Sequence, residues 1–74
     1  MFRKEINMKL SLKKRIENFL RGCGIWISGL NIEKLALNAG YKSSNASRRC
    51  RELVNEGILE RRETIYGYVE YKIK

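Results

Sequence analysis

The 74-residue chain contains no histidine, aspartate, glutamine or proline. Without histidine or aspartate it has neither an imidazole base nor the members of a Ser/His/Asp triad. Its two cysteines, Cys23 and Cys50, are too few for a tetrahedral zinc site when no histidine can join them. We therefore expect no enzyme activity, no metal or other cofactor, and no small-molecule substrate.

Long apolar segments are also missing. No run approaches the roughly 18 apolar residues of a membrane span, and the N-terminus lacks the apolar segment of a signal peptide. We expect a cytoplasmic protein with free thiols and no membrane association. Cys50 falls on the apolar face of a predicted helix, where a thiol packs as a small hydrophobe. A disulfide to Cys23, or a redox switch, is the alternative.

Basic residues dominate what is present. The chain has sixteen Lys and Arg and eight acidic residues, which gives a net charge of +8. Such a balance attracts nucleic acid or another anionic surface. A chain of this length forms one domain that buries only about 60% of its unfolded surface. Residues 1–10 mix basic and apolar side chains without a clear cap, so we predict an N-terminal extension or arm there and a single domain over 11–74.

Residues 11–40 predict two helices and a short strand. Ser11 caps a helix over 12–21, which Gly22-Cys23-Gly24 ends, and the β-branched and aromatic run 25–28 suits a strand. Gly29-Leu30 is predicted to turn the chain into a helix over 32–39, with Asn31 as its N-cap and Gly40 at its end. The predicted apolar face of the first helix is Leu12, Ile16, Phe19 and Leu20, and that of the second is Ile32, Leu35, Ala36 and Ala39.

Residues 44–56 predict the helix around which the chain is organised, with Ser43 or Ser44 as N-cap and Gly57 as C-cap. Its apolar positions recur at i, i+4, i+7 and i+8, so they share one buried face. That face is Ala46, Cys50, Leu53 and Val54. The opposite face is Ser44, Arg48, Arg51 and Asn55, flanked by Asn45, Ser47, Arg49 and Glu52. The period then changes to that of strands, and 58–65 and 68–73 flank a predicted two-residue hairpin turn at Tyr66-Gly67.

These segments resemble the winged helix-turn-helix of small bacterial, archaeal or viral transcription regulators. The resemblance is carried by Ala36-Leu37-Asn38-Ala39-Gly40, by the serine-rich start of the Arg-bearing helix, and by the passage through Gly57 into the first hairpin strand. It covers roughly residues 11–74. It implies an α+β fold, with a three-helix helix-turn-helix core, a short strand and a C-terminal β-hairpin wing. It also implies DNA binding and transcription regulation.

The residues support the same function independently. Residues 42–51 hold four basic side chains and no acidic one, next to a helix N-terminus that favours phosphate. An α-helix fits the major groove, where Arg and Asn can pair with base edges. We predict a double-stranded DNA-binding protein with helix 44–56 in the major groove and hairpin 58–73 as wing. The candidate DNA contacts are Lys42, Ser43, Ser44, Asn45, Ser47, Arg48, Arg49 and Arg51 on the helix and Arg61, Arg62, Tyr66 and Tyr68 on the wing.

Other interpretations remain open at this level. The arginines at 48, 49 and 51 can pair with Glu52, Glu56 or wing carboxylates, and Arg49 at the edge of the apolar face can be structural. The hairpin charges can pair across the strands, and Lys13 and Lys14 can contact phosphate or be solvated. A homodimer would double the DNA footprint. The alternative function is a winged-helix module that binds a protein partner or structured RNA within a larger complex.

Overall fold

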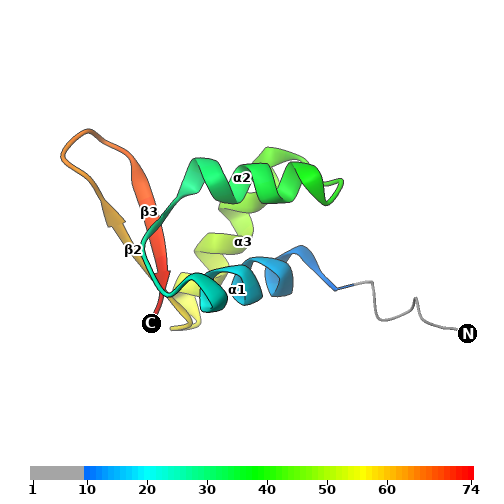
Figure 1. Ribbon diagram of the computed structural model, residues 1–74, viewed down its shortest axis with the longest axis horizontal. Coiled ribbons are helices and arrows are strands. Elements are labelled where there is room, and N and C mark those ends of the chain that lie inside the picture. The colour runs from blue at the N-terminus through cyan, green and yellow to red at the C-terminus, as the bar shows by residue number, and fades with distance from the viewer. Residues whose placement is uncertain (1–9) are drawn as a thin grey trace, which may run out of the picture.

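The computed structural model describes residues 10–74, which form three helices and one three-stranded antiparallel sheet (Figure 1). The elements are α1 (Leu12–Cys23), β1 (Ile27–Ser28), α2 (Gly29–Asn38), α3 (Ser43–Asn55), β2 (Leu59–Glu63) and β3 (Val69–Ile73). The predicted α+β class and element order are confirmed, and the arrangement is compatible with a winged-helix layout. The predicted N-terminal arm lies outside the described residues except for Leu10, and the domain boundary at residue 11 stays a prediction.

Helix α1 begins at Leu12 as predicted and ends at Cys23, two residues beyond the predicted end. The backbone amide of Lys14 donates to Ser11 Oγ over 3.2 Å, the bond expected of an N-cap. Gly22 continues the helix, and Gly24 ends it in the left-handed region at φ 67°. Leu12, Ile16 and Leu20 are buried as predicted, whereas Phe19 stays partly exposed.

The start of α2 differs from the prediction. Gly29 and Leu30 form the first helical turn rather than a loop, and the N-cap is Ser28, not Asn31. Ser28 has an extended backbone, and its Oγ accepts a hydrogen bond from the Asn31 amide over 3.3 Å. Asn31, the predicted N-cap, is therefore inside the helix and donates to the actual N-cap. Because Ser28 begins the helix, β1 is limited to two residues instead of the predicted four.

Helix α3 also begins earlier than predicted, at Ser43. Lys42 is the N-cap residue and makes no side-chain capping bond, so the prediction of Ser43 or Ser44 as cap was wrong. The turn from α2 to α3 is closed by Gly40, at φ 90°, and by the Tyr41 amide, which donates to Ala36 O over 2.9 Å. This closure fixes where Lys42 enters the helix.

The sheet has the order β1-β3-β2, so the predicted strand at the N-terminal side of α2 pairs with the second hairpin strand. The predicted two-residue turn was wrong. The last ladder pair is Glu63 with Val69, and the Thr64 amide donates to Tyr68 O over 2.7 Å. The connection is therefore the three residues 65–67, with Gly67 at φ 84° supplying the left-handed position that such a loop requires.

The hydrophobic core lies where α3 meets α1, α2 and the hairpin, as Figure 1 shows in the crossing of the three helices beside the sheet. Its buried residues are Leu12, Ile16, Leu20, Ile32, Ala36, Ala46, Cys50, Leu53, Leu59 and Tyr71. Three of them come from the apolar face of α3, which confirms the predicted register of that helix. Among residues 10–74 no helix is both long and apolar enough to cross a membrane.

Candidate nucleic-acid interface

The outer side of α3 is polar and basic. Ser44, Arg48, Arg51 and Asn55 are exposed as the helical period predicted, and Ser47 is exposed beside them. Of the remaining candidates on this helix, Lys42 and Ser43 are exposed at its N-terminus, and Asn45 and Arg49 are half-buried. The predicted residues are thus brought together on one helix, with the outer ones reachable by a partner.

Glu52 of α3 and Glu56, the C-cap residue that follows the helix, lie along the side that faces α1. Lys13 of α1 pairs with Glu56, and its Nζ lies 3.9 Å from Glu52 Oε1. Arg49 joins the same cluster, with Nη2 at 3.0 Å from Glu52 Oε2. Lys13 and Arg49 therefore neutralise these two carboxylates. The sequence could not indicate this partner for Lys13, which lies 43 residues before Glu56.

The outer side of α3 carries no carboxylate of its own, although Glu52 flanks it one turn after Arg48. We call the residues Ser44, Ser47, Arg48, Arg51 and Asn55 the basic edge of α3. Within residues 10–74, neither Arg48 nor Arg51 forms an ion pair. The two guanidinium groups keep their hydrogen-bond donors available for an anionic partner.

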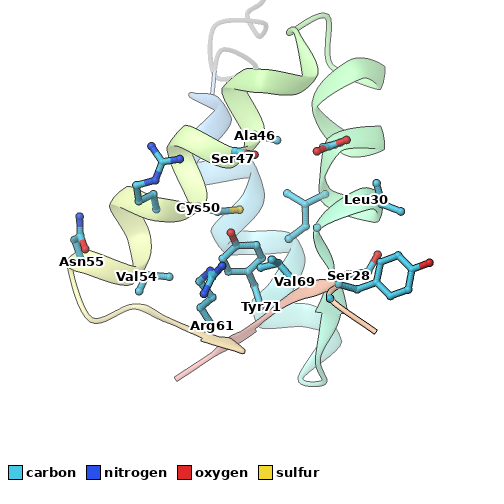
Figure 2. A pocket seen from close by; sticks show the side chains of 16 residues that line it. Ser28, Leu30, Ala46, Ser47, Cys50, Val54, Asn55, Arg61, Val69 and Tyr71 are labelled. Atoms are coloured by element: carbon cyan, nitrogen blue, oxygen red, sulfur yellow. The ribbon is translucent and has the colours of Figure 1, made fainter. Parts of the chain in front are cut away.

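A hollow of about 650 Å³ joins this edge to the hairpin (Figure 2). Its lining includes Arg51 and Asn55 of α3, Arg61 of β2 and Tyr68 at the end of the hairpin loop. Figure 2 shows the Tyr71 ring directed from β3 toward α3, with Arg61 beside it. The predicted wing residue Arg61 and the predicted helix residue Arg51 therefore border one continuous surface.

The floor of the hollow contains two groups whose burial alters their acidity. Burial raises the pKa of the Cys50 thiol to about 12. Burial also raises the pKa of Tyr71, although the neighbouring Arg61 opposes that shift. Cys50 is free and almost fully buried, and Cys23 is free and half-buried, so the prediction of a buried thiol is confirmed and the disulfide is not found.

Arg62 is held on the other face of the hairpin from Arg61. Its Nε donates to Glu70 Oε1 over 2.7 Å, and its guanidinium carbon lies 4.3 Å from the centre of the Trp26 ring. Cross-strand pairing was expected for Arg62, but neither Glu70 nor the stacked tryptophan was identified as its partner. The pairing with Glu70 follows from the strand register, which places Arg62 opposite Glu70. Of the two wing arginines, Arg61 is the one that borders the hollow.

The tip of the hairpin is apolar and exposed. Tyr66 and Tyr68, both predicted to contact DNA, are 79% and 57% exposed, and Ile65 in the loop between the strands is 92% exposed. Ile65 was missed because the predicted turn placed it at the end of a strand. The sequence signal that could have placed Ile65 in the loop is a glycine three residues after Thr64, the spacing of a four-residue turn. In the structure the Gly67 amide donates to Thr64 O over 2.9 Å.

Comparisons of the chain with profiles of known protein families, with characterised proteins and with solved structures gave no match.

Proposed function

We propose that this protein is a winged-helix, double-stranded DNA-binding protein that acts as a transcription regulator. Helix α3 enters the major groove and the β2–β3 hairpin is the wing. The observation that carries the proposal is the pairing of charges on α3: within residues 10–74 Arg48 and Arg51 form no ion pair, whereas Glu52 and Glu56 are already paired with Lys13 and Arg49.

This pairing favours a polyanion, because the one carboxylate that flanks the two arginines, Glu52, is already neutralised by Lys13 and Arg49. Arg48 at the centre of the outer face suits a bidentate contact with guanine, and Asn55 and Ser44 suit further polar contacts. Arg51 and Arg61 border the same hollow and suit phosphates on the two sides of the groove. Lys42 and Ser43 at the N-terminus of α3 add backbone amides that favour another phosphate.

A salt series tests the proposal. Fluorescence anisotropy of a labelled random-sequence DNA duplex is expected to show binding that weakens steeply as salt rises. The double variant Arg48→Ala/Arg51→Ala is expected to bind about tenfold more weakly and with a shallower salt dependence, because it loses charged contacts to the duplex.

The matched control is Lys14→Ala/Arg21→Ala, which removes two positive charges from the exposed side of α1. Both residues pair with Glu17, at 3.7 Å and 2.6 Å, away from the basic edge of α3. The control is expected to retain most of the affinity. Equal losses in both double variants would mean that net charge alone drives binding, which contradicts a groove-docked α3.

An RNA duplex of the same sequence should compete poorly, because the A-form major groove is too narrow for a helix. Strong competition would favour an RNA-binding module instead.

A further inference from the structure

The tip of the hairpin has a composition that neither phosphate contact nor solvation explains. Residues 64–68 are Thr-Ile-Tyr-Gly-Tyr and carry no charge. Ile65 is 92% exposed, and two tyrosines that are more than half exposed stand beside it. Clustered apolar side chains in water commonly mark a binding surface.

The tip is also rigidly built. Thr64 Oγ1 accepts from the amides of Tyr66 and Tyr68, over 3.3 Å and 3.2 Å. The Thr64 amide and carbonyl bond to Tyr68 O and the Gly67 amide, so Thr64 fixes the loop on both sides. Ile65 is therefore presented from a preorganised turn, which lowers the entropy that a partner must remove on binding.

We propose that Ile65 is a wedge that enters the minor groove of bound DNA and partly unstacks one base step. The inference rests on the proposed DNA binding and extends it to DNA deformation. Tyr68 and Gly67 line the same hollow as Arg51 and Asn55, so the tip continues the surface assigned to the DNA. Each hairpin strand has five residues and is therefore about 17 Å long. This length is about half the rise of one DNA turn, which is the distance between neighbouring major and minor grooves. A hairpin beside a helix in the major groove can therefore place its tip at the adjacent minor groove.

Other occupants fit the tip less well. A stable protein interface buries about 800 Å² on each partner, far more than three side chains on one loop present. Binding to an anionic lipid surface uses basic residues beside the apolar ones. The loop has none, and the adjoining strand residues are Glu63 and Val69. An apolar side chain without a nearby charge suits the space between base pairs, where such wedges kink the duplex.

The wedge predicts a dependence on the base step. Pyrimidine–purine steps such as TpA unstack most easily, so they should be the preferred sites. The test uses two duplexes of equal length with 2-aminopurine at the centre. One places it in a TpA step, and the other has an all-purine strand and so contains no pyrimidine–purine step. The fluorescence of 2-aminopurine rises when it unstacks, and anisotropy measures affinity on the same samples.

Wild-type protein is expected to raise the fluorescence of the TpA duplex and not that of the all-purine duplex. Ile65→Ser should abolish the rise and weaken TpA binding by about tenfold, because the apolar wedge is lost. It should leave the salt dependence unchanged, since no charge is removed. Ile25→Ser is the matched control, because Ile25 is 60% exposed and precedes β1 at the end of the sheet away from the loop. It should behave as wild type.

The outcomes separate the two proposals. If wild type binds DNA with a steep salt dependence but neither the fluorescence rise nor the effect of Ile65→Ser is seen, the wedge is overturned and DNA binding stands. If wild type binds neither duplex, the proposed function fails and the wedge with it. If wild type co-floats with vesicles containing phosphatidylserine and Ile65→Ser does not, the tip is a lipid contact and the wedge is overturned.

Discussion

Replacing Leu53 with alanine is expected to lower the free energy of unfolding by about 3 kcal/mol. Leu53 is fully buried at the centre of the apolar face of α3, where the helix meets α1 and β2. The truncation removes apolar contacts and leaves a cavity that the short elements cannot fully close. A domain of this size has a total stability of roughly 4 to 11 kcal/mol, so the loss is a large part of it.

Leu37→Ala is the matched control for this substitution. It removes the same atoms from α2, at a side chain that is 57% exposed. Urea unfolding followed by circular dichroism is expected to show a change within about 0.5 kcal/mol for this variant. Similar losses in the two variants would contradict the position of Leu53 in the core and with it the orientation of α3.

Alkaline pH is expected to destabilise the protein through Cys50. The pKa of its thiol is raised to about 12 in the folded chain from an ordinary value of 9.0, because burial disfavours the thiolate. Below pH 9 the thiol is protonated in both states and the stabilisation is fully present. Between pH 9 and 12 the unfolded chain releases a proton that the folded chain keeps, so the free energy of unfolding falls by up to about 1.4 kcal/mol per pH unit.

Comparison with Cys50→Ala isolates this contribution. From pH 9 to pH 11, wild type should lose roughly 2 kcal/mol more stability than the variant, measured by urea unfolding under reducing conditions. Tyr71, whose pKa is also raised by burial, destabilises both proteins in the same direction. Parallel pH profiles for wild type and Cys50→Ala would show that the thiol is not buried as described.

Apolar periodicity was sufficient to predict the order of the elements and the buried face of α3, because burial requires the same side chains to recur on one side. The element ends were harder to predict because neighbouring polar residues compete to cap. Ser28 takes the role predicted for Asn31, and Lys42 ends up at a cap position that two serines suited better chemically. In both cases the tertiary position of the strand or turn before the helix decides which residue begins it.

The candidate interface was predictable as a set of residues but not as a distribution of charge. The helical periodicity of the sequence was enough to predict that Arg48 and Arg51 lie on the outer face of α3. The pairing of Glu56 with Lys13, and of Arg62 with Glu70 and Trp26, depends on contacts between distant segments. Those contacts distinguish the arginines already engaged within the protein from those open to a partner.

The stack of Arg62 on Trp26 gives the molecule an internal optical probe. Trp26 is the sole tryptophan of the chain, and it adjoins β1 while its ring contacts a side chain of β2. A cation close to an indole alters its emission, so any tilt of the hairpin relative to β1 becomes visible without an added dye. Titrating unlabelled DNA while recording tryptophan emission would therefore report directly on whether the hairpin moves when the duplex binds.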